Sequence, residues 1–291
     1  MDKKICMITG ANSGIGKAAA TQIAQQGYHM ILACRNPERG KTALREIEEN
    51  SHSTSLELMI VDMSRQSSIR GLSKNFFNKY DRLDTLIHNA AIFDITQKDV
   101  VYTSEGIETV WATNHLGPAL LTKLLLDAIK SSEQGRIITI ASKGLKAKPF
   151  LKVDLEDPEF RKKKFSLVDA YYQSKRAQVM YTYWLAEELK DTNITVNCIQ
   201  VPAVQVDISK YLNLPSIMRF LYSLKSKFAL SPEEMAGTYT YLATSDEIRS
   251  VTGKYFDEKR RIVKSNKYTY QTENIEKVMN LTMSYLKQDS G

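Results

Sequence analysis

The sequence of 291 residues predicts an α/β fold in which helices cover both faces of one parallel β-sheet. Three observations lead to this prediction. Short apolar runs rich in β-branched residues alternate with longer stretches of helical periodicity. Several of these runs are apolar almost throughout, as expected of strands that are buried on both faces. A glycine-rich turn at residues 10–16 joins the first run to the first helical stretch.

The predicted strands are short and follow one another along the chain at 4–9, 29–34, 56–61, 84–89, 135–141, 195–200 and 253–256. The predicted helices fill the intervals at 15–26, 37–50, 67–80, 105–130, 170–189 and 232–245. With right-handed crossovers, this order gives a doubly wound Rossmann fold of about seven strands. Since no repeat or Gly/Pro-rich linker interrupts the pattern, we expect a single domain over residues 1–291.

Three segments lie outside this alternation. Residues 152–169 pass from acidic to basic, which predicts a solvent-exposed loop that could form one rim of a site. Residues 203–231 separate the sixth strand from the next helix. The tail from about 257 to 291 contains helical spacing at 274–288.

The composition is that of a globular protein, 43% hydrophobic and 25% charged. No apolar run approaches the roughly 18 residues of a membrane-spanning helix, and the first apolar run is too short for a signal peptide. We therefore expect a cytoplasmic protein. Cys6, Cys34 and Cys198 are odd in number and far apart, which predicts no disulfide framework. Neither these cysteines nor the four scattered histidines have metal-ligand spacing, so no metal site is predicted.

The net charge is +7, and basic residues cluster at 160–165 and 254–268. A solvated surface is the favoured interpretation, with an anionic membrane surface or an acidic partner as alternatives. Nucleic-acid binding is not expected, because no helix-turn-helix, zinc or aromatic-stacking motif accompanies the charge.

The glycine-rich turn predicts a dinucleotide site. Gly10 can make the sharp turn off the first strand. Gly14 and Gly16 let backbone and helix approach closely, so that the free N–H groups of the helix face a pyrophosphate.

The end of the second strand predicts which nicotinamide cofactor is bound. An acidic residue there would bind the ribose of NAD, but this chain has Ala33, Cys34 and Arg35. An arginine suits the 2′-phosphate of NADP through charge-assisted contacts, with Asn36 and Lys17 in place to assist. We therefore predict NADP(H) rather than NAD(H).

The stretch "AYYQSKRAQ" (170–178) offers two tyrosine–cation pairs. Tyr171 precedes Lys175 by four residues, and Tyr172 precedes Arg176 by four, so each pair shares one helix face. A nearby cation favours the phenolate and could make a tyrosine an acid and base. Spacing alone does not decide between the pairs.

Taken together, these motifs resemble the short-chain dehydrogenase/reductase superfamily over about residues 4–256. The marks follow in order: the Gly-x3-Gly-x-Gly turn, "VDMS" (61–64), "HNAA" (88–91), "TNHLGPALLTKLLL" (113–126), "RIITIAS" (136–142), "YYQSKRA" (171–177) and "VPAVQVDI" (201–208). The retinol dehydrogenase-like branch is the most similar, through "ILACRN", "NHLGPALLT", the Ser-to-Tyr interval and "LSPEEMA" (230–236). The resemblance implies oxidation or reduction of lipophilic retinoids, steroids and related carbonyls, usually with NADP(H).

The resemblance also implies the site residues. The catalytic residues are Asn114, Ser142, Tyr171 and Lys175; the residues that bind the cofactor are Gly10, Asn12, Ser13, Gly14, Ile15, Gly16, Arg35, Asn36, Asp62, Met63, Asn89, Ala90, Tyr171, Lys175, Pro202 and Val204. The family pattern Tyr-x2-Ser-Lys-x-Ala fits when counted from Tyr171, so Tyr172 becomes a neighbour.

Each catalytic residue then has an implied role. Tyr171 is the general acid and base, and Lys175 favours its phenolate and hydrogen-bonds the nicotinamide ribose. Ser142 is a second donor to the carbonyl oxygen. Asn114 anchors a water that relays protons to the lysine.

The chain departs from the family at four positions. His88 and Ala91 replace Asn and Gly after the fourth strand, which predicts different packing on the cofactor side. Ala203 and Asp207 stand where Gly and Thr are usual, which leaves the placement of the nicotinamide open.

In this family the counterpart of 203–231 closes over the substrate, so we expect a lid over an apolar carbonyl or alcohol. The alternative is a helix pair packed on the body of the protein or on a partner subunit. The segment's basic and aromatic residues also suit peripheral contact with a membrane.

The resulting prediction is an NADP(H)-dependent oxidoreductase that interconverts a lipophilic carbonyl and its alcohol, as a homodimer. One alternative is a dinucleotide-binding regulatory or scaffold protein with weak catalysis. The other is an isomerase or dehydratase on the same scaffold.

Overall fold

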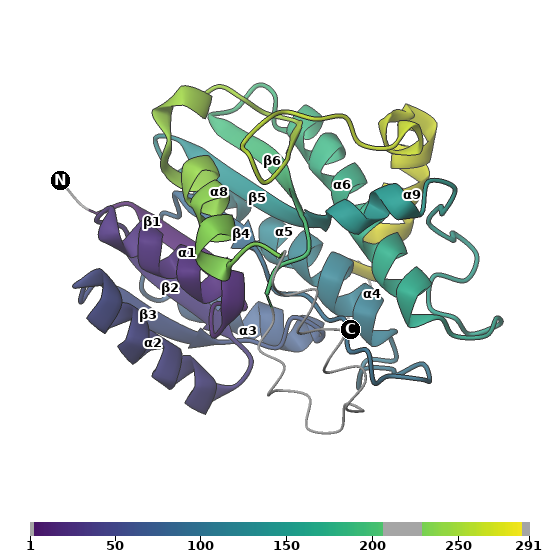
Figure 1. Cartoon of the computed structure of the whole chain (residues 1–291), viewed down its shortest axis with the longest axis horizontal. Coiled ribbons are helices and arrows are strands. Elements are labelled where there is room, and N and C mark those ends of the chain that lie inside the picture. Colours follow the sequence, from purple (N-terminus) through teal and green to yellow (C-terminus); the bar gives the residue numbers. More distant parts are fainter. Residues whose placement is uncertain (1–2, 206–228, 287–291) are drawn as a thin grey trace.

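The computed structural model describes residues 3–205 and 229–286, and its centre is one parallel sheet of seven strands in the order β3-β2-β1-β4-β5-β6-β7 (Figure 1). The strands are β1 (Ile5–Thr9), β2 (His29–Cys34), β3 (Leu56–Ile60), β4 (Thr85–His88), β5 (Gly135–Ser142), β6 (Ile194–Val201) and β7 (Lys254–Phe256). The order reverses at β1, where β4 takes up its other edge. This is the doubly wound fold predicted from the sequence, with every strand within one residue of its predicted bounds.

Helices cover both faces of the sheet. They are α1 (Gly14–Gln25), α2 (Pro37–Ser51), α3 (Gln66–Phe77), α4 (Thr109–Trp111), α5 (Gly117–Lys130), α6 (Leu167–Glu188), α8 (Pro232–Thr244) and α9 (Thr272–Leu286), with 3-10 turns η2 (Lys143–Ala147), η4 (Asp246–Ile248) and η5 (Lys267–Tyr270). In Figure 1, α1 and α8 lie side by side in front of the sheet and α5 lies behind it.

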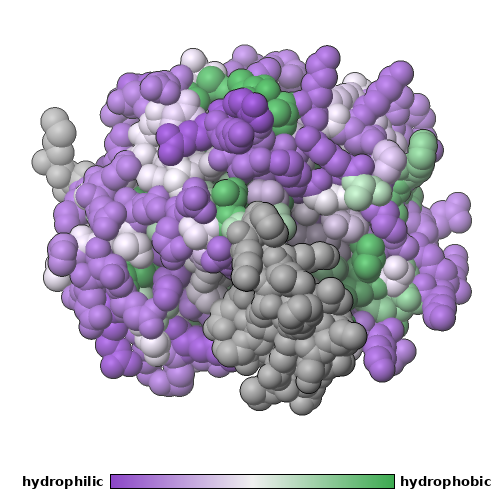
Figure 2. All heavy atoms as spheres, viewed as in Figure 1, coloured by the Kyte–Doolittle hydropathy of each residue, from purple (hydrophilic) through white to green (hydrophobic). Residues whose placement is uncertain are grey.

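The core is split by the sheet into two apolar clusters. Met7 of β1 packs in the cluster under α3, α5, α6 and α9, whereas its neighbours Cys6 and Ile8 pack in the cluster under α1 and α8. Successive side chains of a strand point to opposite faces, so one apolar strand feeds both clusters. The face in Figure 2 is mostly hydrophilic, with small hydrophobic patches, which suits a solvated surface.

The predicted helix over 105–130 is interrupted. Glu108 caps the short α4 by accepting the N–H groups of Val110 and Trp111, at 2.8 and 2.7 Å. A π-helical turn, η1 (Ala112–Leu116), then leads into α5. Such a turn adds a residue to the helix and changes the direction of the side chains within it.

The prediction that 152–169 is a solvent-exposed loop is wrong for its central part. The Asp157 carboxylate accepts the backbone N–H groups of residues 161, 162 and 163, which folds the segment on itself. Phe160 is buried in a cluster with Val110 and Ala170. Val153 is buried in the main apolar cluster, whereas the basic residues 161–164 are exposed.

The tail is part of the fold. Helix α9 begins two residues before the predicted helical range of 274–288 and packs on α6 and the π-helical turn. Of the predicted lid, residues 206–228 lie outside the described residues, and so does Asp207.

The three cysteines are buried and free. Burial raises the pKa of the Cys34 and Cys198 thiols to about 11 each and raises that of Cys6 further. Within residues 3–205 and 229–286, no helix is both long and apolar enough to pass through a bilayer. In the same residues no group of three or more His, Cys, Asp or Glu side chains is placed to hold a metal ion.

Candidate active site

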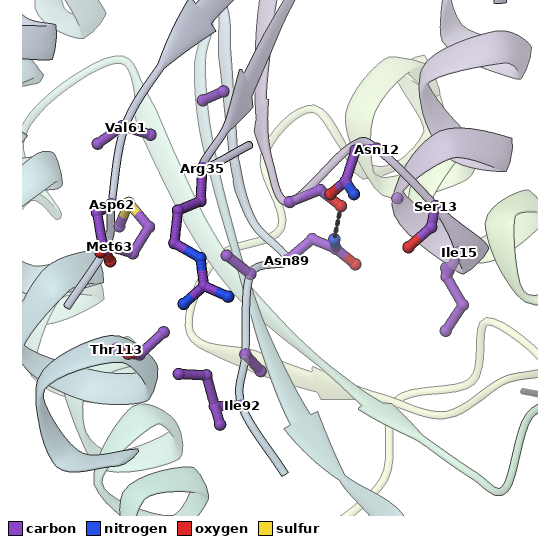
Figure 3. A pocket seen from close by; sticks show the side chains of 15 residues that line it. Asn12, Ser13, Ile15, Arg35, Val61, Asp62, Met63, Asn89, Ile92 and Thr113 are labelled. Carbon is purple, nitrogen blue, oxygen red and sulfur yellow. Dashed lines mark hydrogen bonds between the residues drawn. The ribbon is translucent and has the colours of Figure 1, made fainter. Parts of the chain in front are cut away.

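A cavity of about 320 Å³ opens at the carboxyl ends of β1, β2, β3 and β4. Its walls are formed by Gly10, Asn12, Ser13, Ile15, Gly16, Ala33, Arg35, Val61, Asp62, Met63, Asn89, Ala90, Ala91, Ile92 and Thr113 (Figure 3). Ligands of doubly wound sheets bind at this edge, where the strand order reverses. Ten of the residues predicted to bind the cofactor are therefore brought together here.

The glycine turn fits closely against the end of β4. Asn89 donates its amide to the carbonyl oxygens of Thr9 and Gly10, at 2.9 and 3.2 Å. A side chain at Gly16 would overlap the Asn89 amide and lie 2.7 Å from the Gly10 oxygen. Gly10 itself has φ of +69°, which favours glycine. Only glycine at residue 16 allows this contact between the turn and β4.

The start of α1 is left open toward the cavity. Ser13 is the N-cap residue, but its side chain accepts no capping hydrogen bond. The first N–H groups of a helix have no partner within the helix, and they attract anions. With Asn12, Ser13 and Ile15 in the cavity wall, this turn fits a phosphate group.

Arg35 is exposed, and Figure 3 shows its guanidinium turned into the cavity. Among the described residues it forms no ion pair, whereas the Lys17 ammonium is paired with the Glu46 carboxylate at 2.5 Å. Asn36 caps α2 by accepting the N–H of Arg39 at 2.9 Å. Of the three side chains predicted for the 2′-phosphate, Lys17 is paired, whereas the Arg35 guanidinium and the amide nitrogen of Asn36 remain available.

Asp62 follows β3 and fixes its own loop. One carboxylate oxygen accepts both the N–H and the hydroxyl of Ser64, at 3.0 and 2.7 Å. Its second oxygen has no hydrogen bond within the described residues. Asp62 and the adjacent Met63 close the far wall of the cavity in Figure 3.

Six predicted cofactor residues do not line this cavity. They are Gly14, Asn36, Pro202, Val204, Tyr171 and Lys175. Val204 follows β6 and forms an isolated bridge with Leu230. Sequence reasoning missed five wall residues, which are Ala33, Val61, Ala91, Ile92 and Thr113. Position directly after a strand was the only available signal, and it identifies an edge rather than particular side chains.

The predicted catalytic residues meet beyond the end of β5. Ser142 is its last residue, and its hydroxyl accepts the N–H of Gly144 at 3.2 Å and lies close enough to the Tyr171 phenol to lower the pKa of that group. The Tyr171 ring is half-buried, with its centroid 4.6 Å from that of Phe93. Two hydroxyl groups from β5 and α6 thus lie side by side at the sheet edge.

Lys175 is buried, and its ammonium donates to the Ile140 carbonyl at 2.8 Å. The ammonium lies 5.8 Å from the centroid of the Tyr171 ring. Burial lowers the pKa of Lys175 to about 8 and raises the pKa of Tyr171 to about 12. Burial is the largest cause of the raised tyrosine pKa, and the Ser142 hydroxyl, not Lys175, is the group that opposes it, contrary to the expected fall of the tyrosine pKa beside a cation.

Asn114 lies in the π-helical turn and joins two segments. Its amide accepts the N–H of Ile92 at 2.7 Å and donates to the Ile92 carbonyl at 3.1 Å. It also donates to the Ser174 hydroxyl at 3.2 Å, which in turn donates to the Tyr171 carbonyl at 2.7 Å. Asn114 therefore connects the loop after β4 to the helix that carries the tyrosine.

Gln178 is a site residue that the sequence did not single out. Its buried amide donates to the main-chain carbonyl of Asn114 at 2.6 Å. It stands one turn after Ser174 on the same face of α6, but the 64 residues that separate it from Asn114 hide this contact in the sequence.

The hydroxyl of Tyr172 lies near η2 and not beside the end of β5. A side chain at Gly144 would overlap the Tyr172 hydroxyl, so that hydroxyl lies against the η2 turn. Arg176 is fully buried and donates to the Lys148 carbonyl at 2.8 Å. The structure thus separates the two pairs that spacing left equal.

The two departures after β4 differ in their surroundings. His88 is the last residue of β4 and is buried, with Nε2 2.7 Å from the Thr122 hydroxyl of α5. Burial lowers its pKa to about 3, so it is neutral. His88 therefore packs against α5, and Ala91 alone lines the cavity.

Comparisons with known proteins agree with this geometry. The family model described as short chain dehydrogenase matches residues 4–152. Human retinol dehydrogenase 14 is 34% identical over 89% of this chain and 79% of its own length, and mouse retinol dehydrogenase 13 is 33% identical over 87% and 75%.

Solved structures share the fold. An uncharacterised protein from Mycobacterium paratuberculosis superposes with a TM-score of 0.73 at 23% identity, over 97% of this chain and 92% of its own. A short chain dehydrogenase from Escherichia coli CFT073, solved in complex with NADPH, has a TM-score of 0.65 at 24% identity, over 89% and 97%.

Proposed function

Because the chain belongs to the short-chain dehydrogenase family, on its retinol dehydrogenase-like branch, we propose that it uses NADP(H) to interconvert a lipophilic carbonyl compound and its alcohol. Family membership makes it an oxidoreductase that depends on a nicotinamide dinucleotide. The proposed substrate is a retinoid, a steroid, or a long-chain aldehyde or ketone. The observation that carries the proposal is that the Ser142 and Tyr171 hydroxyls come together at the sheet edge, with the Lys175 ammonium 5.8 Å from the centroid of the Tyr171 ring.

The described residues fit a dinucleotide with a 2′-phosphate. The open start of α1 offers N–H groups to a pyrophosphate, and the contact of Gly16 with Asn89 keeps that surface free of side chains. Arg35 offers an unpaired guanidinium to the 2′-phosphate, as a planar donor that forms charge-assisted bonds with phosphate oxygens. A structural neighbour solved with NADPH supports this assignment.

The bound cofactor supplies or accepts the hydride, and the chain's own residues position the substrate and move the proton. In reduction, Tyr171 donates its proton to the carbonyl oxygen, and Ser142 donates a hydrogen bond to the same oxygen. With a pKa raised to about 12, Tyr171 is protonated at neutral pH and ready for this step. Oxidation requires the phenolate, which the Ser142 hydroxyl favours by lowering the Tyr171 pKa, and we propose that the ammonium of Lys175 adds to this effect.

Asn114 acts here through position. Its side chain is fully engaged with Ile92 and Ser174, so it holds the loop after β4 against α6. Its main-chain carbonyl already accepts from Gln178 and has one lone pair left for a water of a proton relay.

The substrate class is supported by two observations. The relatives are named retinol dehydrogenases. Phe93 is 38% exposed and its ring packs at a tilt against the Tyr171 ring, so it offers an apolar surface next to the reacting residue. We propose that 203–231 completes the site as a lid, and that the enzyme is a homodimer. Sedimentation velocity would test the assembly.

Oxidation of NADPH in the presence of retinaldehyde, a steroid ketone and a long-chain aldehyde tests the function. We expect turnover with at least one, and loss of it in Tyr171→Phe while NADPH still binds. Tight NADPH binding with no turnover on any carbonyl would instead support a regulatory or scaffold protein. Substrate conversion without net oxidation of NADPH would support an isomerase or dehydratase.

A further inference from the structure

A second cavity of about 200 Å³ lies behind the η2 turn and shares no wall residue with the first. It is enclosed by η2, α6, the ends of β6 and β7, and residues 264–269 of the tail. Tyr172 and Gly144 pack between this side of α6 and the Ser142 turn. The second cavity therefore stands apart from both the glycine turn and the Ser142–Tyr171 pair.

The wall contains one buried charged group, Arg176, which is 0% exposed. Nη2 donates to the Lys148 carbonyl at 2.8 Å, but Nε and Nη1 have no hydrogen-bond partner. Within the described residues no carboxylate pairs with this guanidinium. Burial lowers the pKa of Arg176, and the phenols of Tyr268 and Tyr255 oppose this effect. A buried cation without a counter-charge is costly to the fold, by several kcal/mol in general. An anion bound beside the guanidinium would offset this cost.

The other charged side chains in the wall are also positive. Lys146 and Lys264 lie in it, and Asp and Glu are absent from it. Gln200 is 1% exposed, and its side-chain carbonyl oxygen also has no hydrogen-bond partner, so this wall is polar as well as basic. Three basic side chains thus surround a small space with no internal anion among the described residues.

The remaining walls are apolar. Leu145, Val179 and Tyr255 contribute them, so the cavity could cover the body of an organic molecule. At about 200 Å³ it is smaller than the roughly 300–1,000 Å³ of sites for drug-sized ligands. A fatty acid or a retinoid is therefore too large.

We propose that this cavity binds a small organic carboxylate whose charge pairs with Arg176 and whose apolar body lies against Leu145 and Val179. A guanidinium recognises carboxylates through charge-assisted hydrogen bonds, and Lys146 and Lys264 add to the attraction at the entrance. A single aromatic acid has the matching size and charge. Because the two cavities share no wall residue, the carboxylate and the cofactor can occupy the protein at the same time.

Benzoate is the probe, and its neutral isostere benzamide is the matched ligand. Calorimetric titration of the full-length protein, saturated with NADPH, should show benzoate binding at least tenfold more tightly than benzamide. Equal affinity for the two ligands, or no benzoate binding at millimolar concentration, would overturn the proposal, since bridging water alone would then satisfy Arg176.

Two variants locate the binding. Arg176→Met removes the charge and should weaken benzoate binding at least tenfold, with Arg45→Met, an exposed arginine of α2, as the control.

Arg176→Met could fail to fold, so Gln200→Glu is the second variant. It places a carboxylate in the cavity wall beside the buried cation and should abolish benzoate binding while raising the melting temperature. Wild-type benzoate affinity in Gln200→Glu would refute the site, whether or not the enzyme reduces any carbonyl.

Discussion

The two halves of the sheet are built in different ways. In the half formed by β1 to β4, the cavity depends on backbone shape: a glycine turn, an open helix start and short loops that follow strands. In the half formed by β5 to β7, the site depends on side chains that come from distant parts of the chain, such as Gln178 on Asn114, 64 residues apart. A local sequence motif can form the cofactor site, whereas the reacting side chains are positioned by contacts between residues far apart in the sequence.

The largest expected effect compares the two tyrosines of the second half. Tyr171→Phe should lower turnover about 10²- to 10⁴-fold, because the proton donor is lost. Tyr172→Phe should stay within about threefold of wild type, since its hydroxyl lies against Gly144 rather than beside Ser142. Steady-state rates of NADPH oxidation for both variants measure this. Equal losses would show that the pairs are not separated as the structure indicates.

The next effect is specific to the first half. Arg35→Ala should raise KM for NADPH roughly 10- to 100-fold, because a charge-assisted hydrogen bond to phosphate is worth about 1.5–3 kcal/mol. KM for NADH should be unchanged, since NADH lacks the 2′-phosphate. Arg39→Ala is the neighbouring control. An unaltered NADPH KM in Arg35→Ala would remove the basis for preferring NADP(H).

The pH dependence of reduction reports on the buried lysine. The pKa of Lys175 is lowered to about 8, and that of Tyr171 is raised to about 12. At neutral pH both groups carry their protons, so kcat/KM should be level below pH 8. It should fall above about pH 8 as the ammonium is lost, well before the phenol ionises. A profile that stays level to pH 10 would contradict the assignment of Lys175.

The smallest expected effect compares two buried histidines, one in the first half of the sheet and one against the C-terminal helix α9. His88 contacts Thr122 within the first half, and His115 contacts Thr282 of α9, each at 2.7 Å. Burial lowers both pKa values to about 3, below the ordinary value of 6.5. The unfolded chain therefore binds more protons between these values, and stability conferred by each neutral histidine is lost as pH falls from about 6.5 to 3.

Replacement of either histidine by Gln should reduce the slope of unfolding free energy against pH in that range by up to about 1.4 kcal/mol per pH unit. Urea unfolding at several pH values measures it. The comparison with wild type is needed because Glu108, whose pKa is raised to about 7 by burial, contributes with the opposite sign between pH 4.5 and 7. Slopes identical to wild type in both variants would mean that neither histidine is neutral in the fold.

The sequence predicted the sheet, most helix bounds and the glycine turn, because apolar periodicity and glycine positions are local properties. It did not predict that Phe160 is buried, that Gln178 holds Asn114, or that Arg176 is enclosed without a counter-charge. Each of these depends on a partner far away in sequence, which charge patterns and spacing do not encode. The π-helical turn was hidden in the same way, inside one long helical pattern.

The three buried cysteines have a practical consequence. Since the free thiols of Cys6, Cys34 and Cys198 are shielded and held protonated, alkylating dyes should leave the native enzyme unlabelled. A cysteine introduced at Phe150, whose side chain is 93% exposed beside the second cavity, would then be the sole reactive position. The fluorescence of a dye attached at this position would then report ligand binding in the second cavity.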